Sequence, residues 1–315
     1  MADETQLLCV VTPCYNEEEV IEKFYEALKP VLISLPRLNH RIIFVDDGSR
    51  DRTLEKLNAL GARDPAVHVY AFSRNFGHQI ALTAGLDAAR GDAVIMMDSD
   101  LQHPPGLIPD MIRLWREGHD VVSAVRQATE KSGLFKGFTS AVFYWLINFL
   151  SDTNIVRGAA DFCLLSRQAH RALRRLPERH RFLRGMVSWV GFKRAFVFFE
   201  APDRAAGKSK YTLFKMLQLA FNATFSFSVT PIRLATQLGL FTILLSLLYL
   251  VFIVACYFLG WKELAPGWAS IIFLVTFLGG VQLAFVGILG EYIARIFEEV
   301  KRRPLYVFKQ KPPAE

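Results

Sequence analysis

Residues 93–102, AVIMMDSDLQ, join a short apolar run to a cluster of acidic and amide side chains. An apolar run of this length, bounded by polar residues, is typical of a strand that is buried on both faces, as strands are in parallel sheets. Asp98 and Asp100 follow the run two positions apart, and the alternation of side chains along a strand directs both carboxylates to the same side. The stretch therefore predicts a buried strand that leads into a ligand-binding loop.

The same pattern of β-prone runs separated by polar helical stretches continues on both sides of this segment. The expected strands are 7–12, 41–45, 67–72, 93–97, 121–125, 162–165 and 196–199, and the expected helices are 17–32, 51–60, 80–89 and 107–117. Such a βαβα order predicts an α/β fold, with a mostly parallel sheet that carries helices on both faces. Ligands of these folds bind at the carboxyl ends of the strands.

Polar clusters lie at three of these strand ends: residues 12–17, 45–49 and 98–102. None of the three contains the glycine-rich loop of a dinucleotide site or of a phosphate-binding loop. Two carboxylates as close as Asp98 and Asp100 repel each other unless a proton or a cation lies between them. A hard cation, Mg²⁺ or Mn²⁺, takes oxygen ligands and commonly bridges substrate phosphates, so we expect one here.

Hydropathy and charge are segregated along the chain. The mean hydropathy is +0.23, although 21% of the 315 residues are charged. Residues 1–100 carry a net charge of −6, residues 101–200 carry +7 and residues 201–315 carry +6. The acidic first third disfavours a nucleic-acid binder. Four scattered cysteines and no zinc-ligand spacing of His or Cys indicate reduced, non-catalytic thiols and no zinc site.

The apolar residues concentrate in two uncharged runs, 234–261 and 264–290. A helix needs about 20 apolar residues to cross a bilayer, so we expect a transmembrane hairpin with spans at about 234–259 and 268–290. Arg233 precedes the hairpin, and Arg295 and residues 301–303 follow it, so both termini should face the cytosol. The expected organisation is a cytosolic domain over 1–210, an amphipathic segment and linker over 211–232, the hairpin over 233–293 and a basic cytosolic tail over 294–315.

Two amphipathic segments, 134–150 and 211–227, lie outside the hairpin and carry apolar residues at helical spacing beside lysines. Each is either a helix that packs on the core or an interfacial helix that lies on the lipid headgroups. Because a predicted span begins shortly after the second segment, the interfacial interpretation carries at least as much weight there as core packing. For the first segment the two interpretations carry equal weight.

The three strand-end clusters resemble, in order and spacing, the donor site of family 2 glycosyltransferases. Residues 73–78 (SRNFGH) and 103–105 (HPP) are similar to those of the members that glycosylate polyprenyl phosphates, such as dolichyl-phosphate mannose synthase and the bactoprenol-phosphate glucosyltransferases. Residues 160–162 and 207–211 resemble later motifs of that subgroup, and the two spans with residues 290–292 resemble its bacterial branch. The resemblance covers nearly the whole chain and implies the GT-A (Rossmann-like) fold.

The resemblance also implies site residues. Asp98, Asp100 and Gln102 would hold Mg²⁺ or Mn²⁺ against the donor diphosphate, and Asp161 matches the position of the catalytic base. A phosphomonoester acceptor is largely a dianion at neutral pH, since its second pKa is near 6, so Asp161 would orient the attack more than remove a proton. The implied nucleotide-sugar site comprises Pro13, Tyr15, Glu17, Asp46, Asp47 and Asp98, with Asp47 recognising the base or the ribose.

The acceptor phosphate needs cations near the membrane. The residues assigned to it, by match to the family and by position, are Arg126, Arg204, Lys208, Ser209 and Lys210. The basic cluster at 167–184 is read instead as a solvated helix face or as a surface attracted to anionic lipid.

The implied reaction is an inverting, metal-dependent transfer of a sugar from a UDP- or GDP-linked donor to a polyprenyl phosphate at the cytoplasmic face of the inner membrane. One alternative is a processive polysaccharide synthase of the same fold, but its Gln-x-x-Arg-Trp motif is missing around residues 181–189. Another alternative is a non-catalytic assembly subunit. Glycines in the second span, at 279, 280, 287 and 290, suit close helix packing and leave a homo-oligomer open.

Overall fold

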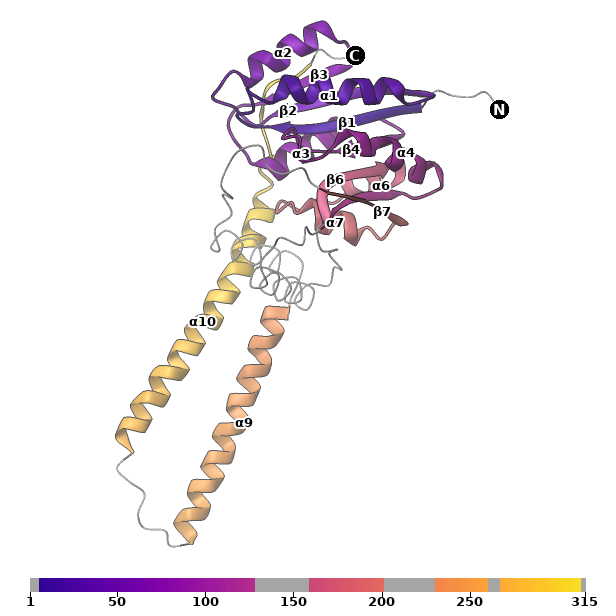
Figure 1. Ribbon diagram of the computed structural model, residues 1–315. Helices are drawn as coiled ribbons and strands as arrows, with labels where there is room; N and C mark the ends of the chain where they lie inside the picture. Colours follow the sequence, from indigo (N-terminus) through magenta and orange to yellow (C-terminus); the bar gives the residue numbers. More distant parts are fainter. Residues whose placement is uncertain (1–5, 128–158, 201–229, 260–266, 313–315) are drawn as a thin grey trace. The chain divides into compact units, whose positions relative to one another are not determined.

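The computed structural model describes residues 6–127, 159–200, 230–259 and 267–312 (Figure 1). Their contacts divide them into two compact units. The first unit contains the strands and helices up to residue 200 and the last strand, and the second contains two long helices. The segment at 134–150 and residues 211–229, both considered above as amphipathic, lie outside the described residues.

The first unit is built on one sheet, whose strand order is β7-β5-β6-β4-β1-β2-β3-β8. Strands β1 to β4 run parallel, β6 runs antiparallel to β4 and β5, and β8 runs antiparallel to β3. The mostly parallel sheet predicted from the sequence is therefore confirmed, and all seven expected strands are present. The strand bounds are β1 Gln6–Cys14, β2 Leu38–Asp46, β3 Val67–Phe72, β4 Ala93–Met96, β5 Val121–Arg126, β6 Ala159–Ser166, β7 Arg194–Phe199 and β8 Phe308–Gln310.

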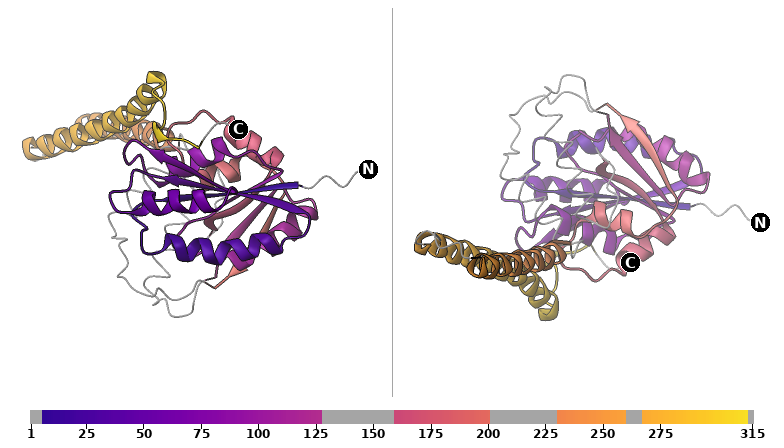
Figure 2. Two further views of the ribbon diagram at one scale, coloured as in Figure 1. Left: turned by 90° about the horizontal axis from the view of Figure 1, so that it is seen from above. Right: turned by 90° about the horizontal axis from the view of Figure 1, so that it is seen from below.

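Helices cover both faces of this sheet, as the views from above and below show (Figure 2). Helices α1, α2 and α4 pack on one face, and α3 and α6 pack on the other. On the second face Gly85 of α3 lies so close to Val11 and Val45 that a Cβ atom at this position would overlap the Val11 side chain. The helices of this unit are α1 Ile21–Ser34, α2 Thr53–Arg63, α3 His78–Ala88, η1 Pro105–Leu107, α4 Ile108–Arg116, α6 Arg167–Arg174 and α7 Leu183–Trp189.

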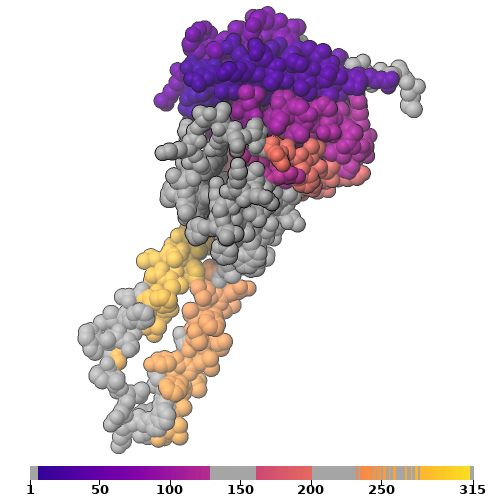
Figure 3. Space-filling model, in the orientation of Figure 1, coloured from indigo at the N-terminus to yellow at the C-terminus, as the bar shows by residue number. Residues whose placement is uncertain are grey.

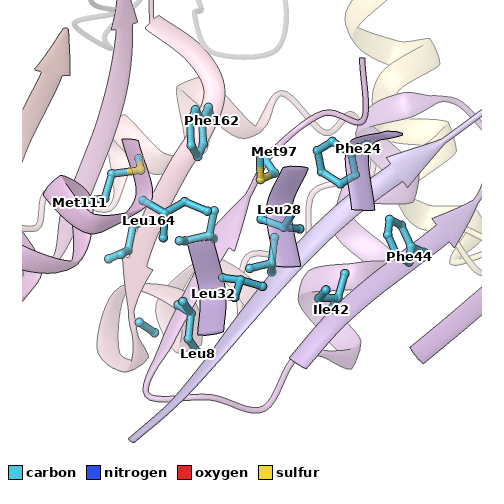
Figure 4. Packing of buried hydrophobic residues seen from close by; sticks show 14 of the residues in the cluster. Leu8, Phe24, Leu28, Leu32, Ile42, Phe44, Met97, Met111, Phe162 and Leu164 are labelled. Atoms are coloured by element: carbon cyan, nitrogen blue, oxygen red, sulfur yellow. The ribbon is translucent and has the colours of Figure 1, made fainter. Parts of the chain in front are cut away.

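The hydrophobic core lies between α1 and the centre of the sheet (Figure 4). Helix α1 presents Phe24, Leu28 and Leu32 at helical spacing, and all three are fully buried against strand residues such as Leu8 and Phe44. The rings of Phe24 and Phe44 meet edge to face with centroids 6.3 Å apart. Burial of each such side chain contributes about 1.5–3 kcal/mol, which holds the first half of the sheet in register.

Strand β1 pairs with β2 on one side and with β4 on the other, so the chain reverses its direction of travel across the sheet at β1. A parallel sheet opens a crevice at such a point, beyond the carboxyl ends of the strands. The loops after β1, β2 and β4 are the polar clusters 12–17, 45–49 and 98–102, and all three therefore meet at this edge. In the space-filling view the two halves of the unit, indigo and magenta to salmon, form one continuous body (Figure 3).

The second unit consists of α9, Thr230–Phe258, and α10, Trp268–Lys301, which contact each other. Helices thus occupy both runs expected as membrane spans. Within the described residues one helix is long and apolar enough to cross a membrane, Phe277–Lys301, and none of this window is buried. In α9 the described residues give a shorter apolar stretch, Ala235–Tyr249. The two-span hairpin is therefore not confirmed.

The stretch expected as a basic tail divides into two parts. Helix α10 continues to Lys301, and Arg302 ends it in the left-handed conformation with φ 48°. The chain then returns to the sheet, where Phe308–Gln310 form β8 on the outer side of β3. Strand β8 was not expected, because its few residues carry no pattern of their own beside the lysines and prolines that surround them.

Candidate active site

The loops after β1 and β2 are tied together by hydrogen bonds between their backbones and polar side chains. Asn16, in the left-handed conformation with φ 55°, donates its N–H to Ser49 Oγ at 3.0 Å and accepts the N–H of Arg50 at 2.9 Å. Glu17 donates its N–H to Thr53 Oγ1 at 2.8 Å. The helix expected from residue 17 begins only at Ile21, and Asn16 instead hydrogen-bonds to the neighbouring loop. The paired loops form a rigid rim at the edge of the sheet.

Pro13, Tyr15 and Glu17, expected to line a nucleoside pocket, lie on this rim. Pro13 is the last but one residue of β1, and its carbonyl accepts the hydroxyl of Ser99 at 3.3 Å, which joins the rim to the loop after β4. Tyr15 is 40% exposed, so its ring presents an apolar surface to solvent at the edge where ligands bind. An exposed aromatic ring on a rigid loop suits stacking against a planar base.

Asp46, at the end of β2, is almost completely buried. Its Oδ2 atom accepts the N–H of Ser49 at 3.2 Å, but its Oδ1 atom has no hydrogen-bond partner among the described residues. Burial raises the pKa of this carboxyl group, although the Ser49 hydrogen bonds oppose the change. A buried acceptor without a partner costs stability, so Oδ1 is suited to a donor that a ligand brings.

Asp47 stabilises the loop before α3 by accepting hydrogen bonds from its backbone. Its Oδ1 atom accepts the N–H of Phe76 at 2.7 Å, and its Oδ2 atom accepts the N–H of Gly77 at 3.0 Å. Gly48 allows this close approach, since a Cβ atom there would overlap the backbone of Arg74. Both carboxylate oxygens of Asp47 are therefore engaged by protein, and its expected contact with a base or ribose stays a prediction.

Asp98 lies at the centre of the site. Its Oδ1 atom accepts a hydrogen bond from His78 Nε2 at 2.7 Å, and its backbone N–H donates to His103 Nδ1 at 3.2 Å. Burial would lower the pKa of His78, but the hydrogen bond and charge of Asp98 outweigh it and raise that pKa. Burial lowers the pKa of His103, in agreement with a neutral ring whose Nδ1 is an acceptor. The 3.7 Å approach of His103 Nδ1 to Asp98 Oδ2 is therefore not an ion pair.

Asp100 and Gln102 follow in a tight turn. The N–H of Gln102 donates to Asp100 Oδ1 at 3.0 Å, and Leu101 between them is left-handed, with φ 59°. In the part of the chain that the structure describes, no group of three or more His, Cys, Asp and Glu side chains could hold a metal ion by itself. Two carboxylates and an amide oxygen on one turn do fit a Mg²⁺ or Mn²⁺ ion whose remaining ligands are diphosphate oxygens.

Asp161 lies near Asp98. Strands β4 and β6 pair antiparallel, the last pair is Met96 opposite Cys163, and Asp98 and Asp161 each lie two residues from that pair. The charges of both acids raise the pKa of His78, which lies beside them. The Asp161 side chain is buried and forms a bidentate salt bridge with Arg184. The Nε atom of Arg184 donates to Oδ1 at 2.6 Å, and its Nη2 atom donates to Oδ2 at 2.9 Å. Gln79 Nε2 donates to Oδ2 at 3.2 Å.

Arg184 and Gln79 are site residues that the sequence did not reveal. The basic cluster at 167–184 was read as a solvated or lipid-facing surface, but Arg184 pairs with Asp161, Arg167 pairs with Asp92 at 2.6 Å, and Arg174 approaches Asp87 at 3.6 Å. The interpretation was wrong for Arg184, which contacts the buried Asp161, whereas Arg167 and Arg174 form ion pairs with partly exposed acids. Buried carboxylates require partners, and that requirement is the one signal that points to a cation near Asp161.

The residues assigned to the acceptor phosphate are only partly described. Arg126 ends β5 and is exposed, beside Phe199 of β7. Arg204, Lys208, Ser209 and Lys210 lie outside the described residues, so their assignment stays a prediction.

The sequence matches the family described as Glycosyl transferase family 2 over residues 9–174. It is 42% identical to the uncharacterized glycosyltransferase YkcC of Bacillus subtilis (strain 168) over 301 residues, which cover 96% of this chain and 93% of that protein. It is 41% identical to the bactoprenol glucosyl transferase of Shigella phage SfII over 303 residues, which cover 96% of this chain and 97% of that one.

A looser likeness links the fold to a crystal structure of glucosyl-3-phosphoglycerate synthase from Mycobacterium tuberculosis, with a TM-score of 0.48, 20% identity and coverage of 70% of this chain and 79% of that one. At this level the likeness carries no conclusion about ligands. The match over half of the chain and the full-length relatives agree with the acidic edge of the sheet: the chain belongs to glycosyl transferase family 2 and is a glycosyltransferase enzyme.

Proposed function

We propose that this enzyme transfers a sugar from a nucleotide sugar to a polyprenyl phosphate, with inversion at the anomeric carbon. Relatives named bactoprenol glucosyl transferase, 40–41% identical over almost their whole length, support the lipid acceptor and make glucose the first sugar to test. In the proposed reaction an oxygen of the lipid phosphate attacks the anomeric carbon, the bond from that carbon to the diphosphate breaks, and the nucleoside diphosphate leaves.

The observation that carries this proposal is the placement of Asp98 and Asp161 two residues from the paired Met96 and Cys163 of the neighbouring strands β4 and β6. On the β1–β2 side of Asp98 lie the rim with Tyr15 and the buried Oδ1 atom of Asp46, which suit a nucleoside. On its other side lies Asp161, held by Arg184 and Gln79. A donor diphosphate at Asp98 would thus present its sugar toward Asp161, where the acceptor enters.

Asp98, Asp100 and Gln102 are proposed to hold the Mg²⁺ or Mn²⁺ ion. When bound, such an ion neutralises the charge that develops on a leaving diphosphate. Asp161 is proposed to orient the acceptor. Both of its carboxylate oxygens accept hydrogen bonds from Arg184, and a phosphomonoester dianion needs little help from a base.

The site is proposed to work at the cytoplasmic face of a membrane. Two helices over the apolar runs, the exposed apolar window Phe277–Lys301 and the basic residues that follow position 290 support anchoring by α9 and α10 as a hairpin. The domain limits at 210, 232 and 293, the interfacial segments at 134–150 and 211–232, and the cytosolic termini belong to the same proposal. A processive synthase and a non-catalytic assembly subunit are the competing functions, and a homo-oligomer is compatible with the glycines of α10.

The test is transfer of label from a panel of radiolabelled nucleotide sugars to short polyprenyl phosphate, using membranes that contain the full chain, with and without metal. One donor should give an organic-extractable product whose sugar has inverted anomeric configuration. The Asp161→Asn variant should be inactive, and Asp110→Asn, an exposed acid on α4, should match the wild type. A long polysaccharide product would favour the synthase, and no lipid-linked product from any donor would exclude the proposed reaction.

A further inference from the structure

The ion pair between Asp161 and Arg184 spans the boundary between the buried floor of the site and its surface. The Asp161 side chain is 7% exposed, whereas the Arg184 side chain is 37% exposed. The guanidinium therefore contacts the carboxylate and is also partly accessible from the surface. Arginine carries N–H donors in a planar fork that matches phosphate oxygens as well as carboxylates, and the contact with Asp161 is bidentate.

Gln79 fixes this arrangement from the start of α3. Its amide nitrogen donates to Asp161 Oδ2 at 3.2 Å, and its amide oxygen accepts the N–H of Leu183 at 3.0 Å. Leu183 is the first residue of α7 and immediately precedes Arg184. The Gln79 side chain therefore positions both the Asp161 carboxylate and the backbone that carries the Arg184 guanidinium. Such bridging is what holds a binding group within the small positional tolerance that catalysis requires.

Electrostatics explain why the site needs a cation at this position. A phosphomonoester dianion that approaches a buried, ionised Asp161 is repelled, because like charges in a partly dehydrated site are poorly screened. An arginine paired with Asp161 cancels that carboxylate charge and places a partly exposed cation beside the incoming phosphate. Asp98, another acidic group of the site, has His78 and the proposed metal beside it instead.

We propose that Arg184 binds the phosphate group of the acceptor at the reaction centre, and that Gln79 is the positioning residue that aligns Arg184 with Asp161. This inference rests on the proposed transfer to a phosphate-headed lipid. It adds Arg184 to the residues proposed for the acceptor site.

The experiment compares the Michaelis constants of Arg184→Gln and Arg184→Lys for short polyprenyl phosphate and for the nucleotide sugar, with the full chain in membranes. Arg184→Gln should raise the KM for the lipid phosphate by about tenfold or more while the donor KM stays within about twofold. Arg184→Lys should recover part of the loss, because it restores the charge but not the fork. Arg171→Gln, which removes an exposed arginine of α6, is the matched control and should behave as the wild type.

Gln79→Leu removes both hydrogen bonds and should affect the lipid KM in the same direction by a smaller factor. In combination with Arg184→Gln it should add little, since residues that act as one unit are not additive. An unchanged donor KM also shows that each variant is folded. If the donor KM rises instead of the lipid KM, Arg184 holds the donor diphosphate and the inference is wrong; it is equally wrong if neither constant changes.

Binding without turnover separates this inference from the proposed function. The wild type should bind short polyprenyl phosphate more tightly than the corresponding polyprenyl alcohol, and Arg184→Gln should lose that difference. If the wild type binds the phosphate but forms no product, the proposed function fails and the role of Arg184 is still decided by this comparison. If the wild type does not distinguish phosphate from alcohol, both proposals fail.

Discussion

The hydroxyl of Tyr306 donates a hydrogen bond to the carboxylate of Asp87 at 3.1 Å, joining residues 219 positions apart in the chain. Asp87 belongs to α3, and Tyr306 lies between α10 and β8, so the contact secures the segment that returns from the long helix to the catalytic domain. The Tyr306 ring also stacks on Phe72 of β3, with centroids 5.3 Å apart. The segment after α10 is thus part of the fold of the domain.

Removal of the Tyr306 ring should loosen the edge of the sheet. We expect Tyr306→Phe to cost about 1 kcal/mol, the value of one hydrogen bond, and Tyr306→Ala to cost about 3 kcal/mol through the loss of aromatic packing. Hydrogen exchange of the β3 amides in the full-length protein measures both effects. Lys309→Ala, an exposed position of β8, is the control; equal protection in all variants would show that β8 does not stabilise β3.

Substitution of Asp47 should act on the structure of the loop before α3. Asp47→Asn keeps one acceptor oxygen but replaces the other with a donor that faces the N–H groups of Phe76 and Gly77. We expect a loss of about 1–3 kcal/mol in thermal unfolding. The turnover number should fall as well, because His78 and Gln79 follow directly. A rise in the donor KM with unchanged stability would instead indicate the contact with base or ribose inferred from the family resemblance.

Gly48 should tolerate no side chain. Its φ of +69° is unfavourable for other residues, and an added Cβ atom would lie within 3 Å of the backbone of Arg74 and Asn75. We expect Gly48→Ala to cost at least about 2 kcal/mol, since neither backbone can move away without breaking the loop that Asp47 holds. Gly106→Ala, where a Cβ atom meets nothing within 4 Å, is the matched control and should leave the melting temperature nearly unchanged.

Asp64 should give the domain a stability that depends on pH. Burial alone would raise the pKa of Asp64, but hydrogen bonds from Lys29, Ala66 and Tyr25 lower it below the ordinary value. A depressed folded-state pKa contributes stability above the unfolded value, about 3.9, and this contribution is lost as the pH falls through the folded value. The wild type should therefore exceed Asp64→Asn by about 2 kcal/mol at neutral pH, and the gap should close below about pH 4.

An exposed acid, Asp110, provides the control for the pH dependence of stability predicted for Asp64. Asp110, which approaches Arg113 at 3.8 Å on the surface of α4, should change stability by less than about 0.5 kcal/mol when replaced by Asn. Thermal unfolding of the solubilised chain between pH 3 and pH 7 measures both variants. A constant gap between the wild type and Asp64→Asn over this range would show that the carboxylate of Asp64 titrates alike in the folded and unfolded states.

Metal removal should abolish transfer if Asp98 and Asp100 hold the proposed ion. A chelator should stop turnover, and added Mg²⁺ or Mn²⁺ should restore it. Asp100→Asn should lower turnover by about 100-fold at a fixed metal concentration and should require more metal for half-maximal activity, because it removes one of the protein ligands. Full activity in the presence of the chelator would exclude metal dependence, and the thermal stability of Asp100→Asn should equal that of the wild type.

The strands could be found from the sequence because each carries its own local signal. The apolar runs at 41–45, 67–72 and 93–97 are short, β-prone and bounded by polar residues, and the structure places a strand at each. Strand β8 carried no such signal. It forms because the aromatic rings of Tyr306 and Phe308 find Phe72 and Tyr70 on β3, which is a contact between distant parts of the chain.

The acidic half of the site was also accessible from the sequence. Asp46, Asp98 and Asp100 follow predicted strands, and parallel strands deliver their carboxyl ends to one edge. The role of each acid could not be predicted from the sequence. Asp46 keeps an oxygen without a partner among the described residues, whereas Asp47 beside it binds the backbone of the loop at Phe76 and Gly77. The two aspartates are adjacent on an alternating backbone, so they face different surroundings.

By itself, then, the sequence determined the class of fold, the edge of the sheet where ligands bind and the segregation of acidic from apolar segments, because periodicity and strand ends are local properties. Only the tertiary structure decided that Arg184 grips Asp161 from 23 positions away and that Gln79 reaches the same carboxylate from 82 positions away. It also decided that the segment after α10 adds an edge strand, β8, to the sheet beside β3. These contacts depend on how helices and strands pack, since a buried carboxylate takes whichever donors the fold brings to it.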